Sequence, residues 1–370
     1  MPKILFYVGG CNRAGPPFPT ANANGISAFR LDTETGAVEA LGAIGGIDNP
    51  TFLAVAPDGK SLSATSEVGG WNEGTISAYA IDPVSGALTY LDKQPTRGDV
   101  TAHLSHDATG RFAAIANYSV LPVTEAPNRA IAVFPRAADG ALGASVAEMT
   151  HVGTGADPER QERPHPHCVR FSPDNRFLVV ADLGIDQLVI YRFDAATGAL
   201  SLHGAANLPP GAGPRHVTFH PTLPVAYVAN ELDSTVASFA YDAAAGSLAL
   251  VAVASTVPAG LAASNYPSGI KVAASGKHLF VANRGHDSIG CFVIDPATGV
   301  ASFTGTVPCG GKWPRDIEFD PTGTLLAVAN QNSDTIDFFR YDAASGVLTP
   351  FGAPVSAGTP TVVSFLPLLG

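Results

Sequence analysis

The feature that most constrains the fold is a phrase that recurs seven times along the chain. Each copy has an alternating apolar run, a short polar turn ending in glycine, and a second apolar run, as in 26–38 (ISAFRLDTETGAV). The turn glycines follow one another at intervals of 47 to 58 residues, at Gly36, Gly86, Gly140, Gly198, Gly246, Gly299 and Gly346. Two alternating runs around a glycine that accepts positive φ are typical of a β-hairpin.

A second hairpin pattern lies between successive copies, for example at 168–182 and 316–330. Each unit therefore holds four short strands in about 50 residues, which is the period of a β-propeller blade. One four-strand unit is divided between the two ends of the chain. Residues 361–367 resemble its first strand, and residues 4–8 with 26–41 supply its other three strands. We predict an all-β, seven-bladed β-propeller that forms a single domain over 1–370. Its C-terminal strand closes the ring by pairing with the N-terminal strands.

Composition narrows the function classes. A net charge of −11 argues against a nucleic-acid partner, which needs a broad basic surface. No run of about 18 apolar residues occurs, so no membrane span is predicted. The four cysteines lack metal-binding spacing and are expected to be free thiols in a reducing compartment. Residues 1–7 lack the apolar region of a signal peptide, so we expect a cytoplasmic location.

Two rings of positions break the repeat. We aligned the copies on the turn residue after each first strand. Six residues before it, they read Thr51, Thr101, His167, Arg215, Ser268, Arg315 and Thr361. At the end of each second strand they read Gly10, Glu67, Tyr118, Leu183, Glu231, Arg284 and Gln331. The two strands are antiparallel, so both rings should open on one mouth of the central channel. The Asn and Asp residues just before the second ring are interpreted as turn formers.

Five charged or polar ring residues should converge at that mouth: His167, Arg215, Glu231, Arg284 and Arg315. Three arginines against one glutamate leave surplus positive charge, which favours binding of a carboxylate or phosphate. The alternative is that these residues form ion pairs that tie neighbouring blades together.

Other chemical groups give weaker signals. His165 and His167 share a strand face and could offer two metal ligands, but no third ligand at metal spacing is evident, so no metal is predicted. Cys168 should point away from His167 and be a buried, inert thiol.

At this point the chain resembles a known family, the seven-bladed propeller lactonases, which include propeller-type 6-phosphogluconolactonases and the fungal 3-carboxy-cis,cis-muconate cyclase. The resemblance rests on 165–167 (HPH), 182–186 (DLGID), 213–216 (GPRH), 230–232 (NEL), 283–289 (NRGHDSI) and 314–316 (PRD). One departure is 266–270 (YPSGI), where the family usually has an acidic residue.

The resemblance implies no metal and no organic cofactor, and places a catalytic His, two Arg and a Glu in the channel. By motif these are His167, Arg215, Glu231 and Arg284. Substrate-binding roles are expected for His165, Asp182, Lys312 and Arg315.

The predicted function is hydrolysis of a sugar lactone by water attack in the channel, and the surplus positive charge favours an anionic lactone as the substrate. Glu231 or His167 would be the general base, and Arg215 and Arg284 would stabilise negative charge. One alternative is a cycloisomerase that closes a carboxymuconate-type diacid into a lactone. Another is a non-catalytic propeller that serves as a binding platform.

Overall fold

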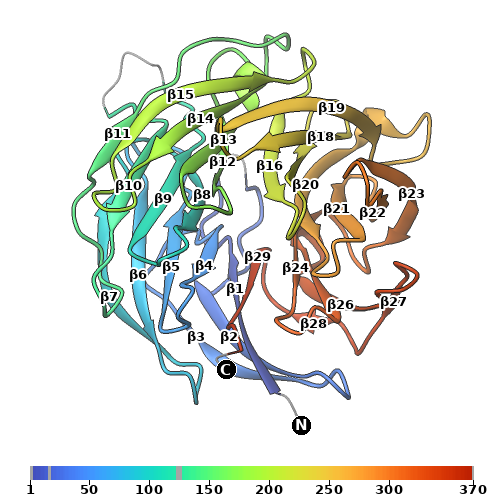
Figure 1. The fold of residues 1–370 in the computed structure, drawn as a ribbon. Helices are drawn as coiled ribbons and strands as arrows, with labels where there is room; N and C mark the ends of the chain where they lie inside the picture. The colour runs from blue at the N-terminus through green and yellow to red at the C-terminus, as the bar shows by residue number, and fades with distance from the viewer. Residues whose placement is uncertain (1–2, 16–17, 122–126, 369–370) are drawn as a thin grey trace.

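The computed structural model describes residues 3–15, 18–121 and 127–368. Seven β-sheets surround a central axis, and the prediction of a seven-bladed all-β propeller is confirmed. Figure 1 shows one strand of each sheet nearest the axis, namely β4, β8, β12, β16, β20, β24 and β29. Met1 and Pro2, which belong to the N-terminal stretch used to predict location, lie outside the described residues.

Six of the sheets follow the chain from the axis outward. The first three are β4 (Leu53–Val55), β5 (Ser61–Ser66), β6 (Thr75–Ile81) and β7 (Leu88–Pro95); β8 (Thr101–His106), β9 (Phe112–Asn117), β10 (Ile131–Pro135) and β11 (Ala147–Met149); and β12 (Pro166–Phe171), β13 (Phe177–Asp182), β14 (Gln187–Phe193) and β15 (Leu200–Asn207). The next three are β16 (Pro214–Phe219), β17 (Val225–Asn230), β18 (Thr235–Asp242) and β19 (Ser247–Ser255); β20 (Tyr266–Val272), β21 (His278–Arg284), β22 (Ser288–Ile294) and β23 (Ala301–Pro308); and β24 (Pro314–Phe319), β25 (Leu325–Asn330), β26 (Thr335–Tyr341) and β27 (Leu348–Pro350). The short β28 (Val355–Ser356) also pairs with β26.

The remaining sheet closes the ring. It contains β29 (Pro360–Phe365), β1 (Lys3–Gly10), β2 (Ile26–Asp32) and β3 (Val38–Ile44), in that order. β29 lies antiparallel to β1 with Phe365 opposite Phe6 and Val363 opposite Val8. The split copy predicted from the sequence is therefore the sheet that joins the two ends of the described chain.

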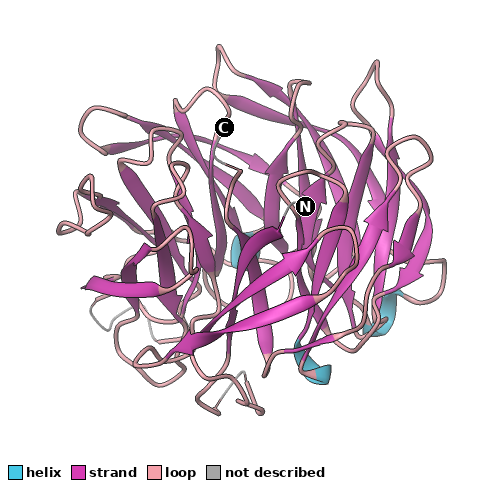
Figure 2. Cartoon of the chain, turned by 90° about the horizontal axis from the view of Figure 1, so that it is seen from below, coloured by secondary structure: helices cyan, strands magenta, loops and turns pink. Residues whose placement is uncertain are grey.

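In the described part of the chain, helical structure is confined to single 3-10 turns, η1 (Leu183–Ile185), η2 (Ala262–Ser264) and η3 (Gln331–Ser333). Figure 2 shows the ring from the side, with strands crossing between two faces that carry the loops. Among the described residues, no helix is long and apolar enough to cross a membrane.

Apolar side chains between neighbouring sheets hold the blades together. Phe6 is fully buried, and its ring lies 5.1 Å from Phe29, 5.6 Å from Phe338 and 5.5 Å from Phe365. The hairpin glycines all have the positive φ expected of them. At Gly246 the need is also steric, because an added Cβ would lie 2.1 Å from the ring of Phe177 in the adjacent blade.

A β-bulge near the start of each of several innermost strands decides which side chains face the channel mouth. Pro166 pairs with Asp182 and Cys168 pairs with Ala181, so His167 is left out of the ladder. Arg215 and Arg315 are skipped in the same way in β16 and β24. A bulge bends its strand and re-aims the extra residue, which turns these side chains toward the axis.

The bulge also corrects the repeat alignment of the second copy. There Thr101 pairs with Asn117 and His103 pairs with Ala116, so the bulged residue is Ala102. Thr101 itself is fully buried and donates a hydrogen bond to Asn117 Oδ1 at 2.7 Å.

The Asn residues that end the second strands are buried anchors, which differs from the turn-forming role predicted for them. Asn117 donates from Nδ2 to the carbonyls of Thr96 and Arg129, at 2.9 and 2.8 Å. Asn330 donates to the carbonyl of Cys309 at 2.9 Å. Because these carbonyls belong to loops next to the outer strands, each amide fixes the end of the blade that carries the channel mouth.

Replacing Phe6 should weaken the closure of the ring. We expect Phe6→Ala to lower the free energy of unfolding by about 3–5 kcal/mol, because it leaves a cavity among three aromatic rings. Urea denaturation followed by tryptophan fluorescence measures this value. Val84→Ala is the control, since Val84 is 82% exposed and its loss should cost under about 0.5 kcal/mol. Equal effects of the two substitutions would contradict the packing argument.

Candidate active site

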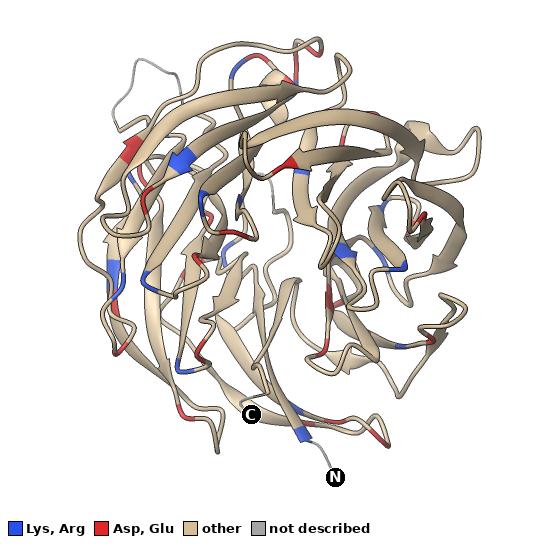
Figure 3. Cartoon of the chain, viewed as in Figure 1, with Lys and Arg blue, Asp and Glu red and all other residues tan. Residues whose placement is uncertain are grey.

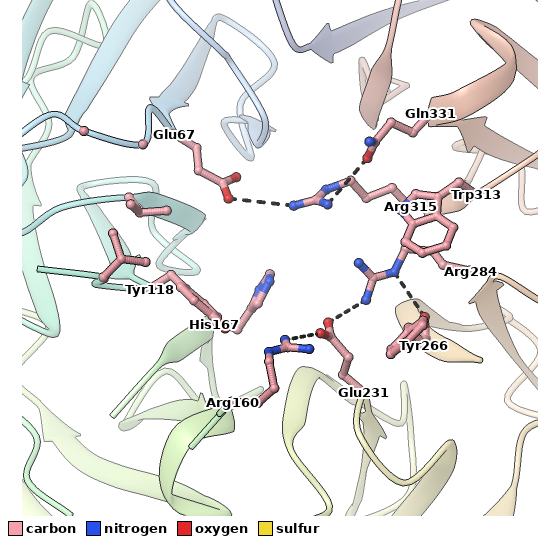
Figure 4. A pocket seen from close by; sticks show the side chains of 14 residues that line it. Glu67, Tyr118, Arg160, His167, Glu231, Tyr266, Arg284, Trp313, Arg315 and Gln331 are labelled. Atoms are coloured by element: carbon pink, nitrogen blue, oxygen red, sulfur yellow. Dashed lines mark hydrogen bonds and ion pairs between the residues drawn. The ribbon is translucent and has the colours of Figure 1, made fainter. Parts of the chain in front are cut away.

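A cavity of about 720 Å³ opens at the mouth of the channel, where the bulged residues and the ends of the second strands meet. Figure 4 shows its labelled side chains converging from different blades on a central hollow. The cavity is lined by Glu67, Gly69, Gly70, Val100, Tyr118, Val120, Arg160, His167, Glu231, Tyr266, Arg284, Trp313, Arg315 and Gln331. The two sequence rings thus share one mouth, as their antiparallel strands require.

Glu231 is the charged centre of this site. Its Oε2 lies 2.5 Å from Nη2 of Arg284 and 3.1 Å from Nε of Arg215, and its Oε1 lies 2.6 Å from Nη2 of Arg160. Burial alone would raise the pKa of Glu231, but the guanidinium groups of Arg284, Arg215 and Arg160 outweigh burial and hold that pKa well below its usual value. Glu231 is therefore an ionised carboxylate that fixes three cations around one edge of the cavity.

Arg284 and Arg215 occupy different depths around that carboxylate. Arg284 lines the cavity, and its Nε donates to the carbonyl of Tyr266 at 3.1 Å. Arg215 is only 2% exposed and lies behind Glu231, with Nη1 3.1 Å from Nε2 of His216. Arg284 can therefore contact a molecule in the cavity. Arg215 can influence such a molecule only indirectly, through its contact with Glu231 and through the positive charge of its guanidinium.

His167 faces the same hollow from the adjacent blade (Figure 4). Its ring lies 5.6 Å from that of Tyr118 and 5.5 Å from that of His216, both edge-to-face. Nδ1 is buried and has no hydrogen-bond partner in the part of the chain that the structure describes. Burial, followed by the charge of Arg215, holds the pKa of His167 well below its usual value, so the imidazole is neutral at pH 7.

The opposite side of the cavity holds a looser charged pair. Nη2 of Arg315 lies 3.7 Å from Oε1 of Glu67, and its Nη1 lies 3.5 Å from Oε1 of Gln331. The guanidinium also rests on the ring of Phe18, 4.8 Å from its centroid. Thr51 donates a 2.5 Å hydrogen bond to the other oxygen of Glu67.

Trp313 and Tyr266 form an aromatic side of the cavity, with ring centroids 6.0 Å apart. Trp313 has a φ of 60°, an uncommon backbone conformation for a residue with a large side chain. Its backbone N–H donates a hydrogen bond to Asp287 Oδ1 at 2.8 Å. Arg284 lies over the indole, with Cζ 5.7 Å from the ring centroid. Backbone strain that the surroundings enforce is concentrated at functional sites in proteins.

Three predicted substrate-binding residues lie outside the cavity lining. His165 is 3% exposed, with Nδ1 2.9 Å from the Tyr118 carbonyl and Nε2 3.1 Å from Glu162. Asp182 is fully buried and accepts hydrogen bonds from the backbone N–H groups of His165 and Gly184. Lys312 is exposed, and its backbone N–H donates to Ser333. These contacts support structural roles for His165 and Asp182, and Arg315 alone of the four predicted substrate-binding residues lines the cavity.

Cys168, next to His167, points into the packed interior, where burial raises the pKa of its thiol. Its Sγ lies 3.5 Å from Nε2 of His103. The described residues contain no group of three or more His, Cys, Asp and Glu side chains that could hold a metal ion.

Sequence reasoning missed Arg160, which lies in the loop between β11 and β12 and belongs to no repeat. The interval between Gly140 and Gly198 is the longest of the set, and this was the available signal of an inserted loop. Gln161 is fully buried and fixes the loop by donating to Asp186 at 2.7 Å and to the Leu183 carbonyl at 2.8 Å. Glu67, Tyr118 and Gln331 stood in the second ring but were not selected as site residues, although all three line the cavity.

Positive charge exceeds negative charge at the site. Arg160, Arg215, Arg284 and Arg315 stand in or directly behind the cavity, against Glu67 and Glu231. In Figure 3 charged residues of both signs lie near the centre of the ring, while many others occupy the outer turns. The mouth therefore carries a formal charge of about two positive units within an acidic protein.

Fold and site together define a closed seven-bladed propeller with one charged cavity at the mouth of its channel. The model of the family described as "Lactonase, 7-bladed beta-propeller" matches residues 6–365. The chain therefore belongs to the seven-bladed β-propeller lactonases, and the prediction of a lactone-hydrolysing enzyme is confirmed at the level of the family.

Several relatives with a named activity or a solved structure are similar to this chain over most of their length. The chain is 36% identical over 313 residues to the 6-phosphogluconolactonase of Bacillus subtilis, with 85% of this chain and 84% of the relative covered. It is 32% identical to the 6-phosphogluconolactonase of Formosa agariphila, with 78% and 80% covered. The structure of the periplasmic gluconolactonase of Pseudomonas aeruginosa has 32% identity and a TM-score of 0.89, with 100% of both chains covered.

The imidazole of His167 should stay neutral far below its usual pKa. We expect its ¹⁵N resonances in the folded protein to show no titration between pH 8 and pH 5.5, whereas in urea they should titrate near 6.5. The unfolded chain then binds this proton first as pH falls, so the contribution of His167 to stability is present above about pH 6.5 and is lost below it. His167→Gln assigns the signal, and a midpoint above about pH 6 in the folded protein would contradict the argument.

Proposed function

We propose that the cavity hydrolyses sugar lactones, with His167 as general base and Arg284 as the group that stabilises the oxyanion. The observation that carries the proposal is the placement of a neutral imidazole and an Arg–Glu–Arg cluster around one hollow. Hydrolysis of a lactone needs these two chemistries, proton transfer to and from oxygen and stabilisation of a negative carbonyl oxygen. The names of the relatives support the same class of substrate.

In the first step, water attacks the carbonyl carbon of the lactone and gives one proton to His167. Nδ1 is closed off from the cavity, which leaves Nε2 as the nitrogen that exchanges this proton. The carbonyl oxygen becomes an oxyanion beside the Arg284 guanidinium. Arg284 is held in place by Glu231 and by the Tyr266 carbonyl before substrate arrives, so little reorganisation is needed during the reaction.

In the second step, the tetrahedral intermediate collapses and the bond between the carbonyl carbon and the ring oxygen breaks. The proton held by His167 passes to the departing alkoxide, which becomes the hydroxyl group of the product. The ring is opened to a hydroxy acid, one water is consumed, and the imidazole returns to its neutral form. No covalent enzyme intermediate is required.

Glu231 is the weaker candidate for the base because both of its oxygens already receive charge-assisted contacts from guanidinium groups. A proton accepted there would break the arrangement that holds Arg160, Arg215 and Arg284 together. We therefore assign Glu231 to positioning the cations.

An anionic substituent on the lactone is the finer part of the proposal. The formal positive charge of the site supports it, and Arg160, whose side chain is 38% exposed, stands at the accessible edge of the Glu231 cluster. Arginine presents paired N–H donors that suit phosphate and carboxylate. Two of the relatives bear the name 6-phosphogluconolactonase, which names a phosphorylated lactone.

The compartment is a separate matter. The cytoplasmic location stays a prediction of the sequence, and one structural relative is named a periplasmic gluconolactonase. Fractionation of the cells that make this protein, followed by immunodetection, measures where it resides.

Substitution of the proposed base should damage turnover more than binding. We expect His167→Gln to lower kcat for a sugar lactone by about 10²–10⁴-fold with a small change in KM, and Arg284→Met to lower it by about 10²–10³-fold. Acid release followed with a pH indicator measures the rate above spontaneous hydrolysis. Lys312→Ala, which alters an exposed neighbour of the site, should keep wild-type kinetics. Near-full activity of either site variant would refute the assignment.

Selection for an anionic substituent should depend on Arg160. We expect wild-type kcat/KM to be higher for 6-phosphogluconolactone than for glucono-1,5-lactone, and Arg160→Gln to reduce that ratio by about 10-fold. Arg163→Gln is a matched control in the same loop, because Arg163 contacts Glu162 and does not line the cavity. An unchanged ratio in Arg160→Gln would remove Arg160 from substrate selection.

A further inference from the structure

The two halves of the cavity are built differently. Around Glu231 the guanidinium groups of Arg284 and Arg160 approach within 2.5 and 2.6 Å, which are short charge-assisted contacts. Across the hollow, Arg315 stands 3.7 Å from Glu67 and 3.5 Å from Gln331. Figure 4 shows these three side chains on the side facing Arg160 and Glu231. Their donors and acceptors are thus close to one another and only weakly bonded.

The long distances from Arg315 to Glu67 and Gln331 do not arise because these side chains lack support from their surroundings. Glu67 is 4% exposed and is held by the hydroxyl of Thr51, while Arg315 rests on the buried ring of Phe18. The strand that carries Arg315 begins next to Trp313, whose left-handed backbone is fixed by Asp287. The carboxylate and the guanidinium are therefore held apart by their surroundings.

A hydroxyl group is the ligand that suits such a pair. It can donate its proton to Oε1 of Glu67 and accept a hydrogen bond from Nη2 of Arg315 at the same time, and the Gln331 amide offers both a donor and an acceptor to a neighbouring hydroxyl. A phosphate has only acceptors in its ionised form and would be repelled by Glu67. The pair is also formally neutral, so the surplus positive charge lies in the Glu231 half.

The aromatic side supports the same conclusion from a different observation. The rings of Trp313 and Tyr266 line the same cavity and offer flat apolar surfaces, and Trp313 lies two residues before Arg315 in the chain. A polyhydroxylated ring presents hydroxyls at its edge and C–H groups on its faces. Polar groups at one wall and aromatic faces at the next complement those two surfaces.

We infer that Glu67, Arg315 and Gln331 form a hydroxyl-binding subsite that selects polyhydroxylated lactones over lactones that lack hydroxyl groups. The inference rests on the proposed lactone hydrolysis and assigns Glu67 as a specificity-determining residue of that site. A site built to hydrogen-bond a substrate hydroxyl discriminates strongly against an analogue without it, because the buried polar groups then stay unpaired.

The test compares two lactones with the same six-membered ring, glucono-1,5-lactone and δ-valerolactone. We expect Glu67→Gln to lower kcat/KM for glucono-1,5-lactone by about 10- to 100-fold, mainly through KM. The value for δ-valerolactone should change less than about 3-fold, because its ring offers no hydroxyl to pair. Where its turnover is too slow to follow, its inhibition constant against glucono-1,5-lactone gives the same comparison.

Glu318→Gln is the matched control, since Glu318 forms a 2.5 Å ion pair with Lys271 in a separate cavity of about 250 Å³. It should leave both lactones unaffected, and circular dichroism should show native folding for both variants. An equal loss on the two lactones, or no loss on either, would overturn the inference.

A wild-type protein that hydrolyses no lactone would refute the proposed function instead. In that case calorimetric binding of gluconate and of hexanoate, which lacks the hydroxyl groups, still tests the subsite. Tighter binding of gluconate that is lost in Glu67→Gln would support the inference, and equal binding of the two acids would overturn it.

Discussion

The Glu231 carboxylate determines the electrostatic layout of the site. One buried anion binds three guanidinium groups, which come from its own blade, from one neighbouring blade and from a loop outside the repeat. Without it, those cations would repel one another in a poorly solvated space. With it, they stand at fixed positions, and their surplus charge is directed at the cavity. Burial lowers the pKa of the nearby His167, the charge of Arg215 lowers it further and the charge of Glu231 raises it, so the electrostatics of Glu231 and the proton affinity of His167 are linked.

The propeller makes this arrangement possible by repeating one local irregularity. A regular ladder would send alternate side chains of the innermost strands into the blade interfaces. The bulges at His167, Arg215 and Arg315 release these residues from the ladder and turn them toward the axis. Buried amides such as those of Asn117 and Asn330 then secure the same end of each blade. Strands and the residues that directly follow them, rather than long loops, therefore carry most of the charged side chains of the site.

The fold was predictable because the repeat contains its own period and its own turns, down to the split sheet that joins 361–367 to 4–8. The residues at the mouth of the channel were predictable because the first two strands of each blade are antiparallel. This places Arg315 in the first ring, and Glu231 and Arg284 in the second, at the same end of the channel. Arg160 was not predictable, since a residue in an inserted loop obeys no repeat. Nor does the alignment distinguish a residue that faces the cavity from one that is bonded behind it, as Arg215 and Asp182 show. That distinction depends on hydrogen bonds between blades, which have no signature in the sequence.

The bulges have a consequence for how such a ring can diversify. A residue outside the ladder donates nothing to strand pairing, so its side chain can be exchanged while its neighbours keep their partners. In this chain Ala102 and Thr361 fill such places with small groups, whereas His167 and Arg215 fill them with ionisable ones. The bulged positions of the ring can thus change residue type while the strand pairing of the propeller stays the same. New substrate preferences can arise there by single replacements, without a new architecture.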